Sequence, residues 1–112
     1  MQYMLLIYSD PNVEETAEMQ EWFDYTNELQ EAGVLVAGEP LDAVENAVTV
    51  RIRDGETLTT KGPFAETTEV LGGFYIVDVD TMEEAEKWAA KLPSTRYGST
   101  EVRVIPPMPS PE

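Results

Sequence analysis

Carboxylates, arginines and tyrosines are the side chains through which this chain of 112 residues could do acid–base chemistry, because it contains neither histidine nor cysteine. Thiolate nucleophiles, disulfides and thiolate metal sites are therefore excluded, and the commonest general base and metal ligand is missing. Glu66 and Asp78 are the candidate catalytic carboxylates. A carboxylate acts as a base at neutral pH only where burial raises its pKa, so both candidates depend on the fold around them.

Three arginines, Arg51, Arg53 and Arg103, form the second candidate group. A guanidinium fork suits a carboxylate or a phosphate, so in so acidic a chain these side chains could hold an anionic ligand. The alternative is that they pair with acids across the sheet and the subunit boundary. The acids considered for this pairing are Glu39, Glu66, Asp78 and Glu101.

Asp78 shares a predicted strand face with Phe74 and Ile76, so we expect it to be partly buried and paired with an arginine. Tyrosine hydroxyls could add hydrogen-bond donors to a pocket, although a core or interface role is the alternative for each. The tyrosines concerned are Tyr8, Tyr75 and Tyr97. Tyr97 lies beside Arg96 in a segment that either closes a pocket or forms an ordinary connection.

The charge balance narrows the range of partners. Twenty-two acids against seven bases give a formal net charge of −15, which argues against nucleic acid and against anionic membranes. No phosphate loop, dinucleotide glycine pattern or calcium loop occurs, so we expect no cofactor and no metal. The first eight residues form a short apolar run without a basic segment, which predicts a cytoplasmic protein.

Elements that would position these residues follow from the apolar pattern. Strands are predicted over 3–8, 34–38, 46–53, 56–60, 73–79 and 99–105. Asp54-Gly55 is a hairpin turn signal between two of them. Asp10 is predicted to cap a first helix that has Pro11 at its first position and ends at Gly33.

The two predicted helices each carry an apolar stripe. In the first helix the stripe is Met19, Trp22, Phe23, Thr26 and Leu29. The second helix begins at a capping box of Thr81 and Glu84 and ends before Pro93. Its stripe is Met82, Ala85, Trp88, Ala89 and Leu92.

This order of elements predicts an α+β fold, ferredoxin-like βαββαβ with an extra hairpin, over residues 1–106, with an extended Pro-rich tail over 107–112. Two helices cover only one face of such a sheet, yet strands 3–8 and 74–79 are apolar on both faces. A second copy is the simplest cover, which predicts a homodimeric α+β barrel. A monomer with a partly apolar groove is the alternative.

The loop Lys61-Gly62-Pro63-Phe64-Ala65-Glu66-Thr67-Thr68-Glu69, followed by Leu71-Gly72-Gly73-Phe74-Tyr75, resembles the signature of the YCII-related family. It is especially similar to the branch named for its Asp-Gly-Pro-Phe motif, whose members read DGPFAETKE. Lys61 replaces the Asp of that motif, and Thr68 stands where the branch usually has Lys. The resemblance extends over nearly the whole chain, through Ala32–Leu35, Gly38-Glu39 and Arg96–Gly98.

What the resemblance implies is mainly structural: the family fold is the dimeric ferredoxin-like barrel. Better-studied relatives look like enzymes with a His–Asp pair, which a chain without histidine cannot contain. Genes of the branch often stand beside those of extracytoplasmic-function sigma factors, which implies a regulatory link by association only.

The motif loop itself allows two interpretations. Gly62-Pro63 is a rigid turn that would anchor Phe64 in a core or at the dimer interface and fix Glu66 and Thr67 on a pocket wall. The alternative is a folding motif that fixes the edge of the dimer.

Together these observations predict a small homodimer with a pocket between sheet and motif loop for a small anionic or polar organic molecule. The expected ligand-binding residues are Arg51, Arg53, Phe64, Thr67, Tyr75 and Tyr97. In an enzyme, Glu66 or Asp78 would accept the proton, and Arg51 or Tyr75 would hold an oxyanion. The alternative is a non-enzymatic module that docks a regulatory protein such as a sigma factor, and a purely structural dimer domain is the third reading.

Overall fold

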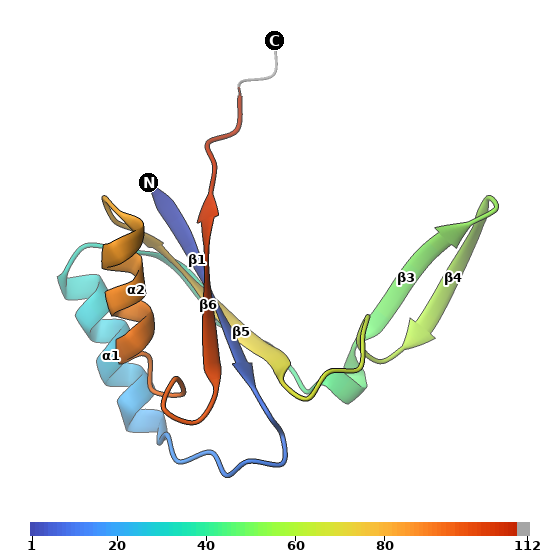
Figure 1. The fold of residues 1–112 in the computed structure, drawn as a ribbon, viewed down its shortest axis with the longest axis horizontal. Helices are drawn as coiled ribbons and strands as arrows, with labels where there is room; N and C mark the ends of the chain where they lie inside the picture. Colours follow the sequence, from blue (N-terminus) through green and yellow to red (C-terminus); the bar gives the residue numbers. More distant parts are fainter. Residues whose placement is uncertain (110–112) are drawn as a thin grey trace.

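A four-stranded antiparallel sheet with two helices on one face forms the body of the molecule (Figure 1). The computed structural model describes residues 1–109. The sheet contains β1 (Gln2–Ser9), β2 (Leu35–Pro40), β5 (Val70–Asp78) and β6 (Ser99–Ile105) in the order β2-β5-β1-β6. With α1 (Met19–Glu31) after β1 and α2 (Met82–Lys91) after β5, this is the mixed α+β arrangement expected of a ferredoxin-like fold.

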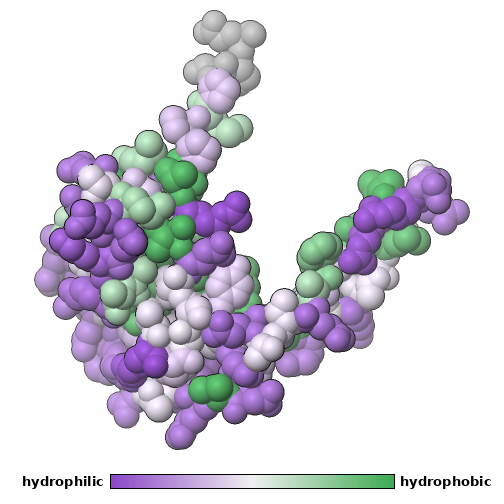
Figure 2. Space-filling view, viewed as in Figure 1, coloured by the Kyte–Doolittle hydropathy of each residue, from purple (hydrophilic) through white to green (hydrophobic). Residues whose placement is uncertain are grey.

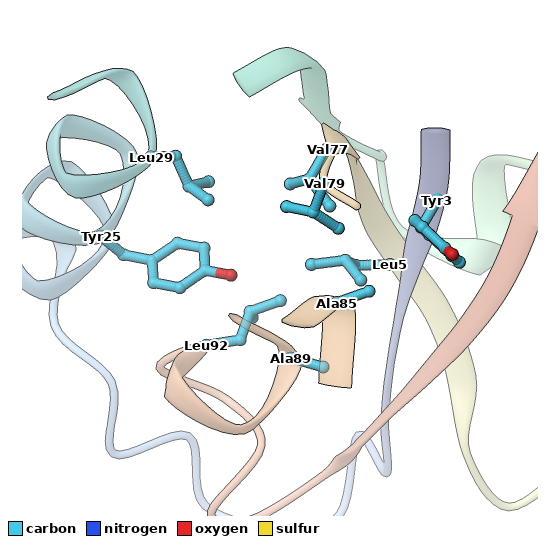
Figure 3. Packing of buried hydrophobic residues seen from close by; sticks show 9 residues of the cluster. All are labelled: Tyr3, Leu5, Tyr25, Leu29, Val77, Val79, Ala85, Ala89 and Leu92. Carbon is cyan, nitrogen blue, oxygen red and sulfur yellow. The ribbon is translucent and has the colours of Figure 1, made fainter. Parts of the chain in front are cut away.

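The core lies between the sheet and the two helices, as Figure 3 shows. β1 is central, because it pairs along its whole length with β5 on one side and β6 on the other. Alternate residues of β1 point to the helices, and of these Tyr3 and Leu5 are buried. The other buried apolar residues are Tyr25, Leu29, Val77, Val79, Ala85, Ala89 and Leu92.

The first helix begins later than predicted. Asp10 does not cap α1; its side chain accepts a hydrogen bond from the backbone of Asn12, at 2.9 Å, and closes a local turn. The N-cap is Glu18, whose backbone N–H donates to Glu21 Oε2 at 2.9 Å, as in a capping box. The prediction for the other end is confirmed: Gly33 adopts a φ of +73°, which is the left-handed conformation of a helix C-terminus.

The apolar stripe of α1 also differs from the prediction. Leu29 and Tyr25 are buried, and Trp22 is half-buried. Met19 and Phe23 instead point to solvent, with 67% and 57% of their surface exposed. Because the helix starts at residue 19, Met19 lies in its first turn. The face that packs is therefore centred on residues 22, 25 and 29.

Tyr25 links the two helices and the sheet. Its hydroxyl donates to the backbone carbonyl of Trp88 on α2 at 2.7 Å. Its ring meets Tyr75 of β5 and Trp88 edge to face, at centroid distances of 5.4 and 6.2 Å. Burial raises the pKa of the Tyr25 phenol, so this group stays a neutral hydrogen-bond donor.

The second helix matches its predicted start. The Thr81 hydroxyl accepts a hydrogen bond from the backbone N–H of Glu84 at 3.2 Å, which is the N-cap predicted from the sequence. After the helix the chain turns into β6 through Gly98. A Cβ built on Gly98 would lie 2.4 Å from the carbonyl oxygen of Tyr8, so only glycine allows this close approach.

One ion pair fastens this connection to the start of α1. The Arg96 guanidinium donates to both carboxylate oxygens of Glu21, at 2.7 and 3.1 Å, and its Nε donates to the Thr16 hydroxyl at 3.1 Å. The hydrogen bonds from Arg96, and then the one from the Glu18 backbone N–H, hold the pKa of Glu21 down at about 2. The same carboxylate caps α1, so a single side chain joins the helix start to the loop before β6.

A two-stranded hairpin projects from the body (Figure 1). It consists of β3 (Val48–Arg53) and β4 (Glu56–Lys61), which pair only with each other in the sheet arrangement. Asp54 and Gly55 form the turn with φ values of +51° and +78°, as their sequence predicts. The segment before β3 forms the short 3₁₀ turn Val44–Asn46, so the strand starts two residues later than predicted. We call residues 48–61 the arm.

Other boundaries shift slightly. β5 begins at Val70 rather than Gly73, and β2 extends to Pro40, which an edge strand tolerates because proline lacks only the N–H. In the described part of the chain, no helix is long and apolar enough to cross a membrane. Beyond β6 the described chain continues without regular structure to Pro109, and the rest of the predicted tail lies outside the described residues.

The corrected stripe of α1 makes a stability prediction. Leu29→Ala should lower the free energy of unfolding by about 2–5 kcal/mol, because it leaves a cavity in the core. Phe23→Ala on the same helix should change it by less than about 0.5 kcal/mol, because that ring is exposed. Urea unfolding followed by circular dichroism measures both, and equal losses would contradict the packing described for α1.

The Glu21–Arg96 pair predicts a pH dependence. The pKa of Glu21 lies at about 2 in the folded chain against an ordinary value near 4.5, so the pair stabilises the fold above about pH 4.5 and this contribution disappears as the pH falls towards 2. Glu21→Gln keeps a capping side chain but removes the charge. The stability difference between the wild type and this variant should therefore be largest at neutral pH and shrink between pH 5 and 2. A difference independent of pH would refute it.

Candidate functional site

One face of the four-stranded sheet carries no helix. Figure 1 shows both helices on the same side of the sheet. The register of β1, β5 and β6 places the residues between the core positions on the opposite side. We call this the open face, and its residues in the three strands are Gln2, Met4, Leu6, Tyr8, Leu71, Phe74, Ile76, Asp78, Ser99, Glu101, Arg103 and Ile105.

Apolar side chains form the floor of the open face. Met4 and Leu6 of β1 pair in register with Ile76 and Phe74 of β5, so the four side chains adjoin across the two central strands. Each of them is only half-buried in the single chain. An antiparallel sheet with one face in water normally alternates apolar and polar residues, and these strands do not.

A polar cluster borders this floor on β1 and β6. The Tyr8 hydroxyl donates to Glu101 Oε1 at 3.3 Å. Arg103 lies two residues farther along the same face of β6, opposite Met4. Burial raises the pKa of Tyr8, the Glu101 carboxylate raises it further, and the positive charge of Arg103 opposes both. The cluster thus combines a hydroxyl donor, a carboxylate acceptor and a guanidinium.

The motif loop reaches the same end of the sheet. Ser99 donates a hydrogen bond to Glu69 Oε1 at 2.9 Å, and the Thr67 hydroxyl donates to the backbone carbonyl of Glu69. Ser99 is also the register partner of Tyr8. Glu69 therefore lies beside the polar cluster, and the role of Thr67 is to shape the end of the loop.

The start of the motif loop is fixed by Gly62. Its N–H donates to the carbonyl of Ala47 at 2.7 Å, and its own carbonyl accepts from the Thr49 hydroxyl at 2.9 Å. Its φ of +103° is a conformation that favours glycine. The chain bends at Gly62, where the sequence predicted a turn.

Phe64 is not anchored in the core of the chain. Its ring is 77% exposed, and its notable contact is the Arg51 guanidinium, 5.3 Å from the ring centroid. Glu66 is also exposed, so its carboxylate stays hydrated in the single chain. The loop leaves the hairpin and enters β5 along the surface, and no helix lies over it to bury the ring.

Asp78 departs from its predicted environment. It lies on the open face but at the last position of β5, where it is exposed and pairs with the terminal ammonium of Met1 at 3.0 Å. Its partner is therefore not an arginine. Glu66 precedes the first residue of β5 and Asp78 is its last, and nine strand residues span about 26 Å. One chain does not bring the two candidate carboxylates together.

The arginines of the arm do not join the polar cluster either. Arg53 donates to the carbonyl of its neighbour Ile52 at 2.9 Å, and Arg51 stacks on Phe64. The acid pairings considered for Arg51, Arg53 and Arg103 do not form within residues 1–109, where the ion pairs are those of Met1, Lys91 and Arg96. The arm holds its arginines away from the body, so the valine side of β3 does not meet the helices.

Two predicted tyrosines lie on the helix side of the sheet. The Tyr75 hydroxyl shares a 2.8 Å hydrogen bond with the Thr26 hydroxyl of α1, so Tyr75 belongs to the packing of the helices. Tyr97 is half-buried in the connection before β6, where burial and then the nearby Glu15 raise its pKa. Neither side chain reaches the open face.

Two open grooves lie on the helix side. One open groove of about 390 Å³ runs between α1 and the end of α2, and its charged walls include the paired Glu21–Arg96 and Glu28–Lys91. Another of about 410 Å³ lies between α2 and β6. Residues 1–109 contain no group of three or more acids placed to hold a metal ion.

The resulting site differs from the predicted one in composition. Tyr8, Glu101 and Arg103 follow one another along the open face, and Glu69 lies beside Ser99 at the Tyr8 end. Tyr8 and Arg103 were among the candidates from the sequence, whereas Glu69 and Glu101 were not predicted as ligand-binding or catalytic residues. The sequence signal for Tyr8, Glu101 and Arg103 is that successive side chains of a strand point to opposite faces of the sheet. It places the three on one face once strands 3–8 and 99–105 are known to be neighbours. The position of Glu69 depends on the path of the loop before β5, which the pattern of side chains along the strands does not indicate.

Comparisons with known proteins found a matching family and a relative. Residues 1–109 match the model of the YCII-related domain. The chain is also similar to an uncharacterized protein, R00369, of Rhizobium meliloti (strain 1021). The two share 38% identity over 116 aligned positions, which cover 94% of this chain and 92% of the relative.

The charge arrangement of the polar cluster makes a prediction about Tyr8. Glu101→Gln should lower the pKa of the Tyr8 phenol, because it removes the carboxylate that opposes ionisation. Arg103→Met should raise this pKa. Carbon-13 NMR titration of labelled tyrosine follows the phenol directly, and Tyr97 serves as the internal control. Shifts of the same sign in both variants would contradict the cluster.

Proposed function

Because this chain belongs to the YCII-related domain family, we propose that it acts as a homodimer that binds a small anionic or polar organic molecule at the open face. The second wall of the pocket is the open face of the other copy, in a dimeric α+β barrel with the extra hairpin outside it. Within the family we assign the chain to the Asp-Gly-Pro-Phe branch, from the match over Gly62–Thr67 and at Glu69.

A dimer is supported by the apolar floor of the open face. Phe74, Ile76, Met4 and Leu6 are half-exposed in the single chain, and both helices are already used on the other side. Burying such side chains stabilises an association by roughly 25 cal/mol for each Å² of apolar surface removed from water. Two copies related by a twofold axis would offer each other the same apolar surface.

The observation that carries the ligand proposal is the Tyr8–Glu101 hydrogen bond with Arg103 on the same face. Arg103 forms no ion pair within residues 1–109, so its guanidinium is free to bind a carboxylate. The apolar floor beside it suits the hydrocarbon part of such a molecule. We therefore propose a small organic carboxylate as the ligand class.

Proton transfer at this site, without histidine, would use Glu101 or Glu69 as acceptor and Tyr8 as donor. Between two sheets the carboxylates would lose water, which is the condition under which a glutamate becomes a base near neutral pH. Glu66 and Asp78 lie at opposite ends of β5. They could act together only if the dimer places Glu66 of one copy beside Asp78 of the other. No cofactor enters the proposal.

Benzoate, an aromatic carboxylate, is a suitable probe of the pocket. Its addition to the nitrogen-15-labelled protein should shift the amide signals of β1, β5 and β6 around Tyr8 and Arg103. Arg103→Met should weaken binding about tenfold or more, since a charge-assisted contact is lost. Arg53→Met, a matched loss of one guanidinium on the arm, should leave it unchanged. Shifts elsewhere, or equal effects of both substitutions, would refute the proposed pocket.

The dimer is checked in the same samples. Sedimentation equilibrium should give a dimer for the wild type, and Ile76→Glu should give a folded monomer, because it places a charge on the apolar floor. Circular dichroism reports whether the variant still folds. A wild-type monomer at micromolar concentration would refute the homodimer and with it the enclosed pocket.

A second candidate function is a non-enzymatic module that docks a regulatory protein, such as a sigma factor. The observation that favours it is the exposure of Met19 and Phe23 on α1, away from the open face. This function requires a stoichiometric complex that Phe23→Ala abolishes while dimerisation persists. Binding of a small molecule at the open face does not require such a complex.

A further inference from the structure

The arm stands apart from the body of its own chain (Figure 1). The radius of gyration is 16.3 Å, whereas a compact chain of this length has about 13 Å. The arm forms its own two-stranded sheet, and isolated two-stranded hairpins are only marginally stable in water. A regular hairpin with so little support from its own chain points to a partner that covers it.

One face of the arm is apolar and exposed. Val48, Val50 and Ile52 alternate along β3 and are 57%, 60% and 67% exposed. Their cross-strand neighbours on the same face are Lys61, Thr59 and Thr57, so methyl groups continue the surface onto β4. Figure 2 shows hydrophobic residues along the arm, at a distance from the body.

The charge of the arm is opposite to that of the rest of the chain. Residues 48–61 contain three basic and two acidic side chains and carry +1, whereas the other residues, with four basic and twenty acidic side chains, carry −16. Arg51 and Arg53 lie on the face opposite the valines. An arm of this sign is attracted to the body of another copy, while two bodies repel each other.

The base of the arm adjoins the proposed dimer interface. The arm is joined to β2 at Pro40 and to β5 at Val70, and these two strands form one margin of the open face. A second copy seated on the open face therefore meets the arm as well. Because a twofold dimer is reciprocal, each copy would contribute one arm and receive one.

We propose that the arm is an intersubunit clasp whose Val48–Val50–Ile52 face packs on the body of the second copy. This inference rests on the proposed homodimer and goes beyond it, since face-to-face sheets alone do not require the arm. The arms also bring the basic charge that offsets repulsion between two acidic bodies. Each pocket is then complete only when the partner's arm is in place beside it.

The chain contains no cysteine, so a single one can be placed at will. We would attach a benzophenone photo-crosslinker to Val50→Cys and mix equal amounts of nitrogen-14 and nitrogen-15 protein. Mass spectrometry should find arm peptides joined to body peptides of the other isotope. Thr60→Cys, on the opposite face of the arm, is the matched control and should give at least several-fold fewer of these products.

The outcomes separate the clasp from the dimer. A dimer in sedimentation whose crosslinks join only peptides of one isotope overturns the clasp and leaves the homodimer standing. A monomer overturns both. Crosslinks that form only when a different protein is present would assign the arm to that partner instead and also overturn the clasp.

A substitution on the arm gives an independent readout. Val50→Glu should raise the dissociation constant of the dimer by roughly tenfold or more, because it buries a charge against the second copy. Thr60→Glu adds the same charge to the opposite face and should change this constant far less. Both positions are exposed in the single chain, so circular dichroism should be unchanged. Equal effects of the two variants would overturn the clasp.

Discussion

Two helices cannot cover both faces of a four-stranded sheet, and most of what is unusual in this chain follows from that limit. β1 and β5 carry apolar side chains on each face, yet α1 and α2 pack on the same one. The core on the helix side needs no further cover. There Tyr25 of α1 contacts β5 through its ring and α2 through its ring and hydroxyl. No helix within residues 1–109 therefore covers the open face, although several of its side chains are apolar.

Local signals in the sequence were sufficient where a single residue determines the backbone. Three local features are present as predicted: the helix end at Gly33, the Asp54-Gly55 turn and the Thr81 cap. Few residue types adopt a positive φ or accept a hydrogen bond from a free N–H at the start of a helix, so the sequence indicates these features directly. By residue type Asp10-Pro11 is the stronger helix start, but Glu18 and Glu21 form the cap eight residues later. Their weaker local signal is supported by Arg96, a residue remote in sequence that binds the Glu21 carboxylate.

The candidate site could be predicted only in part, because its members meet through strand pairing rather than through spacing. Tyr8 and Glu101 are 93 residues apart and touch because β1 and β6 are neighbours in register. Asp78 was correctly placed on the face of Phe74 and Ile76, but the strand ends there, so it reaches solvent and Met1. Phe64 was predicted to be anchored by the motif loop, but its ring is 77% exposed in the single chain, and no local sequence signal indicates this.

Lys61 connects the departure from the resembled motif to the charge of the arm. The motif has Asp at this position, and with Asp the arm would carry −1 instead of +1. Lys61 is the last residue of β4 and pairs with Val48, so its charge lies at the base of the apolar face. In a chain with a net charge of −15, placing one of the seven basic residues there changes the sign of the arm's net charge. In the proposed clasp, Lys61 in place of the motif's Asp would increase the charge complementarity between the arm and the body of the second copy.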